Sequence, residues 1–366
     1  MPCKLAIPTM SLGHCSAGHS LETKLNAAQS YGYQGVEVCW EDLEAIANQN
    51  QCDDLPIPLP IAMPPIGPFP SRGQITAALK IRTMCQDRGI EIVCLQPFMQ
   101  YEGLLNRLEH ESRFSELLVW IKLAHILGTD MIMMPSSSLP QDQVNTDLDS
   151  IAEDFQKAAD AGRREQPPIR FACESRCSAT RIDRWEFCWD VIKKVDRPNF
   201  GMCLDTFHMA GLIFADPAVP SGRVPDGEKA VKMSMQRLVK RVKVHCDKVF
   251  LVQMGDARLP DEPIVPGSPD YDTEQGQRMV WSRKYRLFYG EQAHGAYLPI
   301  KEIAETIFNG IGFEGWVSLE LFNSRMDCRD PNVPTELARR GAISWHKLAN
   351  DMGWWPTFPA PNKGIV

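Results

Sequence analysis

The chain has 366 residues, of which 44% are hydrophobic and 23% charged, a composition typical of folded soluble proteins and not of disordered or membrane-spanning chains. Its formal net charge of -7 argues against a nucleic-acid partner, because a nucleic-acid binder needs clustered Lys and Arg to neutralise phosphates. No apolar run reaches the ~18 residues that span a bilayer and no secretory signal precedes the first apparent strand, so we expect a cytoplasmic protein without a membrane partner.

Short apolar segments alternate along the chain with longer segments of helical periodicity. Eight short segments are predicted strands: 4–9, 35–40, 91–97, 131–136, 169–175, 200–207, 249–256 and 316–322. Helices are predicted near 21–31, 75–88, 111–127, 147–161, 185–195, 226–240, 299–308 and 334–350. Strict alternation indicates βα units with a parallel sheet, and eight strands close a (β/α)8 TIM barrel. We therefore predict an α/β protein with a single TIM-barrel domain over 1–366.

Two segments that follow predicted strands are unusually long. The first, 53–73, is rich in Pro, and the second, 256–298, follows the seventh strand; a C-terminal tail, 351–366, comes after the last helix. Loops at the carboxyl ends of barrel strands line the active-site face, so both are candidate active-site loops. For 53–73, a surface loop without a role in the active site is an equally good interpretation. The twelve cysteines are scattered without a CxxC pair, which favours reduced, buried thiols over a zinc cluster or disulfides.

Four late strands carry a polar residue at the carboxyl end, namely Glu174, Asp205, Gln253 and Glu320. Barrel interiors are otherwise filled by Val, Ile and Leu, so four oxygen donors would converge if these side chains point inward. Three buried carboxylates repel one another unless a cation lies among them. Oxygen donors favour a hard ion, so we predict one divalent metal, Mg or Mn in preference to Zn or Co.

His208 lies three residues after Asp205 and can reach the same cavity. An imidazole, with an ordinary pKa of about 6.5, is a good general base, although a ligand or a hydrogen-bonded structural residue are alternatives. Glu37, on the second strand, is interpreted as a structural inward carboxylate and not as a fifth ligand.

Several Arg residues are candidates for binding an anionic substrate group, because a guanidinium matches a carboxylate with two parallel hydrogen bonds. Arg176 shares a strand face with Glu174, and Arg286 stands in the segment WSRKYR, where Ser282 adds a hydroxyl. Arg258 and Arg283 have the same chemistry and less support. The alternative for the segment 282–286 is a solvated charged surface.

Five segments carry a resemblance to a known family: QPFMQYEG (96–103), CLDTFH (203–208), VQMGDAR (252–258), WSRKYR (281–286) and SLELFN (318–323). The chain resembles the xylose-isomerase-like sugar-phosphate isomerase/epimerase superfamily and, within it, the fungal 3-dehydroshikimate dehydratases of quinate and shikimate catabolism. The resemblance implies that Glu174, Asp205, Gln253 and Glu320 hold the metal. It implies that Ser282 and Arg286 bind substrate. The sequence departs from the pattern at Met99, where relatives can carry an Arg.

The resemblance implies a hydro-lyase that converts 3-dehydroshikimate, a small anionic substrate, to protocatechuate. The ketone at C3 and hydroxyl at C4 can chelate a metal, which acidifies the C4 proton. We expect His208 to remove that proton and count Glu174 with it as a catalytic residue, and Arg176, Ser282, Arg286 and Arg258 as substrate-binding residues. The group that protonates the departing hydroxyl is left open, as is assembly into a homo-oligomer.

Three other functions compete with this interpretation. A ketose isomerase or epimerase could use the same metal site to pass a proton through an ene-diolate, but its neutral substrate would not need an Arg clamp. A repair endonuclease would need several zinc ions and a basic groove, which the acidic composition disfavours. A non-catalytic barrel would be expected to lose metal ligands, whereas all four donors are present.

Overall fold

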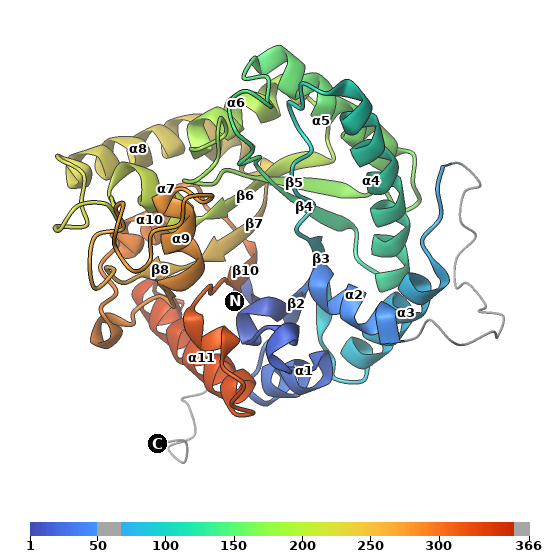
Figure 1. Ribbon diagram of the computed structural model, residues 1–366, viewed down its shortest axis with the longest axis horizontal. Helices are drawn as coiled ribbons and strands as arrows, with labels where there is room; N and C mark the ends of the chain where they lie inside the picture. The colour runs from blue at the N-terminus through green and yellow to red at the C-terminus, as the bar shows by residue number, and fades with distance from the viewer. Residues whose placement is uncertain (50–66, 355–366) are drawn as a thin grey trace.

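A computed structural model of the chain describes residues 1–49 and 67–354, and its strands form a closed barrel. Eight parallel strands follow one another around it in the order β1–β10–β7–β6–β5–β4–β3–β2, with helices on the outside (Figure 1). They are β1 (Cys3–Pro8), β2 (Gly35–Cys39), β3 (Glu91–Gln96), β4 (Met131–Pro135), β5 (Arg170–Glu174), β6 (Phe200–Asp205), β7 (Val249–Met254) and β10 (Gly315–Leu319). The predicted TIM barrel is confirmed.

At least one helix follows every strand of the barrel in the chain. They are α1 (Leu21–Ser30), α2 (Trp40–Gln49), α3 (Arg72–Gln86), α4 (Arg107–Leu127), α5 (Leu148–Arg163), α6 (Trp185–Val195), α7 (Thr206–Ile213), α8 (Gly227–Val242), α9 (Gln277–Lys284), α10 (Ile300–Glu305) and α11 (Val333–Asp351). Short 3₁₀ helices cover Thr9–Leu12, Cys15–Ala17, Lys243–Lys248, Gln292–His294 and Ser324–Asp327, and a π turn, Thr306–Gly310, extends α10.

The sequence prediction missed α2, α7 and α9. The first two begin at the residue that follows a strand, so no loop separates the two periodicities. The sixth strand, predicted through residue 207, was too long for the same reason: it ends at Asp205, whose side chain caps α7.

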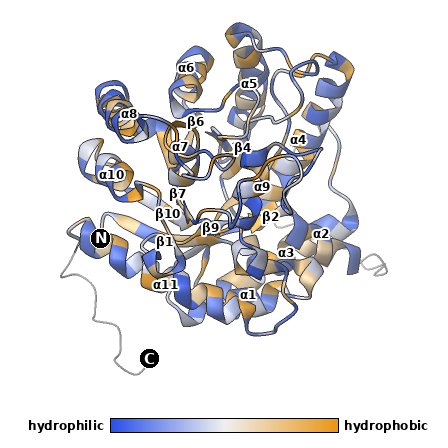
Figure 2. Cartoon of the chain, turned by 60° about the vertical axis from the view of Figure 1, so that its left-hand side comes forward, coloured by the Kyte–Doolittle hydropathy of each residue, from blue (hydrophilic) through white to orange (hydrophobic). Residues whose placement is uncertain are grey.

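The core has two parts, one inside the barrel and one between strands and helices. The inner part consists of small and sulfur-containing side chains with a few larger ones: Ala6, Val93, Cys94, Met131, Met133, Ala172, Cys203 and Leu251. Figure 2 shows apolar colour on the strands and on helix faces turned toward them, with polar colour on the outer faces. Each of the eleven cysteines among the described residues is free, and eight are buried as predicted, whereas Cys15 and Cys246 are half-buried and Cys328 is exposed.

Two register irregularities set which residues face one another inside the barrel. One lies between Val36 and Glu37, and it places Glu37 opposite Cys94. The other lies at the β6–β7 pairing, and it places Asp205 opposite Gln253. Such irregularities re-aim side chains, so they help to bring the polar strand ends together.

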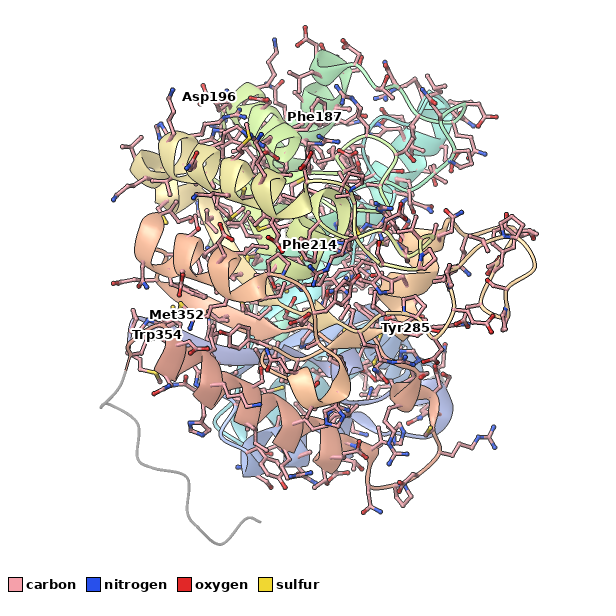
Figure 3. The ribbon with its side chains drawn as sticks, turned by 90° about the vertical axis from the view of Figure 1, so that its left-hand side faces the viewer. Phe187, Asp196, Phe214, Tyr285, Met352 and Trp354 are labelled. Atoms are coloured by element: carbon pink, nitrogen blue, oxygen red, sulfur yellow. The ribbon has the colours of Figure 1, made fainter. Side chains whose placement is uncertain are left out.

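The segment 256–298, predicted as a long loop, contains regular structure. It holds α9 and a short antiparallel pair, β8 (Asp256–Ala257) with β9 (Arg286–Leu287). Tyr285, next to β9, bridges to Asn323 just beyond β10. In Figure 3 Tyr285 lies in the half of the molecule opposite Trp354. The segment therefore lies over the carboxyl ends of the strands.

The other long segments fall partly outside the described residues. Residues 53–66 of the Pro-rich segment and 355–366 of the tail are not described, whereas α3 already begins at Arg72 and α11 ends at Asp351. Among the described residues no helix is both long and apolar enough to cross a membrane.

Candidate active site

The four polar strand-end residues, Glu174, Asp205, Gln253 and Glu320, lie together at the carboxyl ends of β5, β6, β7 and β10. We call these four residues the ring. Glu174 and Asp205 are the last residues of β5 and β6, and Glu320 follows directly after β10. All four, including Gln253, are at most 4% exposed. Gln253 Nε2 donates to Glu320 Oε1 over 3.1 Å, and candidate ligand atoms of Glu174, Asp205 and His208 lie within 4.8 Å of one another.

Asp205 belongs to a strand and a helix at once. Its Oδ1 accepts hydrogen bonds from the backbone N–H groups of Phe207 (2.7 Å) and His208 (3.3 Å), so it is the N-cap of α7. That bond fixes the carboxylate and leaves Oδ2 facing the barrel interior. The same turn brings the His208 side chain beside the ring.

Arg286 supplies the cation that contacts the ring in this structure. Its Nη1 donates to Asp205 Oδ2 over 2.8 Å and to Glu320 Oε2 over 2.6 Å, and its side chain is only 1% exposed. Its Nε and Nη2 donate to Ser282 Oγ, over 3.3 and 3.1 Å. The residue predicted to bind substrate therefore lies in the site, but its hydrogen bonds go to the protein's own carboxylates.

The buried carboxyl groups of the ring have unequal affinities for protons. Burial, together with the charge of Asp205, raises the pKa of Glu174 to about 8. Burial also raises the pKa of Glu320 well above its usual range. Burial acts the same way on Asp205, but the charge of Arg286, the neighbouring imidazole of His208 and hydrogen bonds from Arg286 and Glu320 together lower the pKa of that carboxyl. Negative charge therefore concentrates on Asp205, next to Arg286.

The chemistry of the ring fits a divalent cation. Glu174 Oε1 is buried and has no hydrogen-bond partner among the described residues, although a carboxylate oxygen is a strong acceptor. Carboxylate and amide oxygens are the ligands that hard divalent cations prefer. Glu174, Asp205 and His208 form a group that could hold a metal ion.

The imidazole of His208 lies between two hydrogen-bond donors. At Nδ1 it faces the backbone N–H of Cys177 over 3.2 Å, and at Nε2 it faces Arg286 Nη2 over 2.8 Å. A neutral imidazole has one unprotonated nitrogen and can accept only one of these bonds. Burial lowers the pKa of His208 well below its usual range, so the ring is neutral. The position of its proton is therefore coupled to the position of Arg286.

The structure places the remaining predicted Arg residues differently. Arg176 is buried near the ring, and its Nε and Nη2 donate to the carbonyl oxygen of Ser136 over 3.0 and 2.6 Å. Arg258 pairs with Asp261 over 2.9 Å and lies over the ring of Tyr285. Both contacts lie within its own long segment, 256–298, and do not reach the four strand-end residues.

Two features near the site were not anticipated. The thiol of Cys177 lies 3.3 Å from His208 Nδ1, and no motif in the sequence marked that cysteine. Beside Met99, where relatives can carry an Arg, a guanidinium comes from α4 instead: Arg113 donates to the Met99 carbonyl oxygen and lies over the Phe98 ring. A periodicity argument cannot detect either contact, because both join separate parts of the chain.

Comparisons with known proteins agree with the fold. Residues 25–348 match the family model described as xylose isomerase-like TIM barrel. A 3-dehydroshikimate dehydratase of Neurospora crassa is 56% identical over 96% of this chain and 95% of its own length. A 3-dehydroshikimate dehydratase of Pseudomonas aeruginosa is 25% identical over 86% of this chain, which spans 38% of that protein. A solved fusion of a xylose isomerase-like TIM barrel with 4-hydroxyphenylpyruvate dioxygenase superposes with a TM-score of 0.68 and 22% identity, covering 98% of this chain and 45% of the fusion.

Proposed function

The chain belongs to the xylose isomerase-like TIM barrel family, and from that premise we propose that it removes water from 3-dehydroshikimate to give protocatechuate. The observation that carries the proposal is the 56% identity to the Neurospora crassa dehydratase over nearly the full length of both chains. The site supports it, because polar residues at four neighbouring strand ends converge beside a buried His and a buried Arg. The enzyme is a hydro-lyase.

We propose that Glu174, Asp205, Gln253 and Glu320 hold one divalent metal ion, with Mg or Mn favoured over Zn or Co because the donors are oxygens. The partnerless oxygen of Glu174 supports this assignment. A bound divalent ion would supply the positive charge that an enolate of the substrate requires.

His208 is proposed as the proton carrier. Its Nε2 faces Glu174 Oε1 at 3.6 Å and Asp205 Oδ2 at 3.8 Å, so the nitrogen is directed into the ring. The neutral ring can accept a proton from C4 of the substrate. The C5 hydroxyl then leaves with a proton as water, and loss of a C6 proton with protonation of the C3 oxygen completes the aromatic ring of the catechol.

Arg286 and Ser282 are proposed to bind the substrate carboxylate. A guanidinium and a hydroxyl that already contact each other provide donors for both oxygens of that group. Arg286 must release Asp205 and Glu320 to do so, and charge compensation within the ring by a divalent ion would permit that release. Arg176 lies close to Glu174 as a further candidate, with two of its donors already bonded to Ser136.

The test is to incubate purified protein, loaded separately with Mn²⁺ and Mg²⁺, with 3-dehydroshikimate and with a panel of ketoses, and to follow all reactants by proton NMR. We expect one equivalent of protocatechuate per 3-dehydroshikimate consumed and no change in the ketoses. Epimerised or isomerised ketose without catechol formation would favour the isomerase alternative, and would overturn the proposed function.

A further inference from the structure

Glu37 is a buried carboxylate inside the barrel that the proposed mechanism does not use. It lies on β2, far along the chain from the ring, and is 0% exposed. The register shift between Val36 and Glu37 places it opposite Cys94 on β3. Burying a carboxylate is costly unless donors compensate it, so its position requires an explanation.

Three donors converge on this carboxylate. Its Oε2 accepts from Cys94 Sγ over 3.3 Å and from Gln96 Nε2 over 3.0 Å, and Gln253 Nε2 reaches both oxygens over 3.1 and 3.2 Å. Both of its oxygens thus accept hydrogen bonds from the protein. Its hydrogen bonds point to a supporting role for Glu37 and not to a fifth metal ligand.

Gln253 is the residue on which this carboxylate acts. The Gln253 amide nitrogen donates to Glu37 and also to Glu320 Oε1, so both of its hydrogens face carboxylates. Turning the amide over would bring its oxygen against the oxygens of both carboxyl groups, and only a proton on one of them could then supply a donor. The two carboxylates therefore decide which end of the amide faces which way.

The amide oxygen is left on the opposite side. There it accepts a hydrogen bond from the thiol of Cys203 on β6, a weak donor, over 3.4 Å. Cys203 lies two residues before Asp205 on the same strand, and Asp205 itself pairs with Gln253, so the amide oxygen is directed towards β6 and away from Glu37 and Glu320. Its capacity as an acceptor is largely unused.

We infer that Glu37 is a positioning residue that orients the Gln253 amide so that its oxygen, not its nitrogen, is presented to the metal. The inference rests on the proposed metal site. Residues that orient metal ligands through hydrogen bonds typically change metal affinity by about 10–100-fold when they are replaced. In this proposal Glu37 affects metal binding only through Gln253. Replacing Glu37 should therefore have little effect on metal affinity once Gln253 has been removed.

The experiment is a double-mutant cycle on metal affinity. Glu37→Met, Gln253→Leu and the double variant are prepared without metal, and Mn²⁺ is titrated into each and into the wild type by calorimetry. We expect Glu37→Met to weaken Mn²⁺ binding about 10–100-fold in the wild-type background. In the Gln253→Leu background the same replacement should change the dissociation constant by less than about threefold, because the oriented group is absent.

The outcomes separate the role of Glu37 from the existence of the site. If the wild type binds no divalent metal, the proposed metal site itself is wrong. If it binds and Glu37→Met binds equally well, or if the loss persists in full beside Gln253→Leu, the positioning role is overturned. Asp154→Asn, a buried carboxylate change on α5, is the control that should lower stability and leave Mn²⁺ affinity unchanged. Should Glu37→Met fail to fold, Glu37→Gln enters the same cycle.

Discussion

Replacing Arg286 with Met removes the cation that contacts two buried carboxylates. Arg286 Nη1 lies 2.8 Å from Asp205 Oδ2 and 2.6 Å from Glu320 Oε2, and all three side chains are nearly inaccessible to solvent. Removing one partner of a buried ion pair costs about 3–5 kcal/mol, because the remaining charge is uncompensated. The raised pKa of Glu320 lets that group take up a proton, so we expect a loss near the lower limit, about 3 kcal/mol.

The assay is urea unfolding at pH 7 in the presence of EDTA, compared with Arg325→Met as a matched control. Arg325 also contacts two carboxylates, but its side chain is 31% exposed, and surface pairs contribute about 1 kcal/mol or less. In a parallel series without EDTA, added Mn²⁺ should stabilise Arg286→Met more than the wild type, because the ion no longer competes with a guanidinium. A loss in Arg286→Met no larger than in the control would refute the reasoning.

Three further predictions follow from the site and its surroundings. His208→Asn should lower kcat by about 10²–10⁴ and leave metal content intact, and near-normal turnover would exclude His208 as the proton carrier. Ser282→Ala should raise KM about tenfold with a smaller effect on kcat, whereas an unchanged KM would remove Ser282 from substrate binding. Burial raises the pKa of Asp256 to about 7, so the folded state holds its proton more tightly than the unfolded chain and stability falls as the pH rises from about 4 to 7. Asp256→Asn should flatten that slope in thermal unfolding measured from pH 4 to 8, and an unchanged slope would contradict the assignment.

The barrel could be predicted from the sequence because its signal is repeated. Each strand is a short apolar run bounded by a helical segment, and the predicted strands agree with the structure within three residues at their ends. Two of the missed helices, α2 and α7, are not separated from the strand before them, because each begins at the next residue. In α7 the side chain of Asp205 ends the strand and begins the helix, so one residue belongs to both patterns.

The ring could be predicted for a related reason. Glu174, Asp205, Gln253 and Glu320 are polar residues in otherwise apolar segments, and the carboxyl ends of parallel strands meet at one face. Their convergence followed from topology alone. Their roles as ligands and the assignment of substrate-binding residues stay predictions.

The choice among the Arg residues could not be made from the sequence. Arg258 and Arg286 have the same chemistry and stand in the same long segment, yet one pairs with Asp261 and the other enters the barrel. That difference is set by the short β8–β9 pairing and by α9, which no periodicity predicted. The contact between Glu37 and Gln253 joins β2 to β7, and it depends on barrel closure.

The central claim is that the buried ring works as a metal site for dehydration. Its most direct test is the rate of protocatechuate formation from 3-dehydroshikimate by the purified protein, measured as isolated, after EDTA treatment and after Mn²⁺ or Mg²⁺ is added back. We predict that formation stops after EDTA and returns with the ion, and that Glu174→Gln prevents the recovery. Undiminished formation in the EDTA-treated protein, with metal removal verified by elemental analysis, would contradict the account.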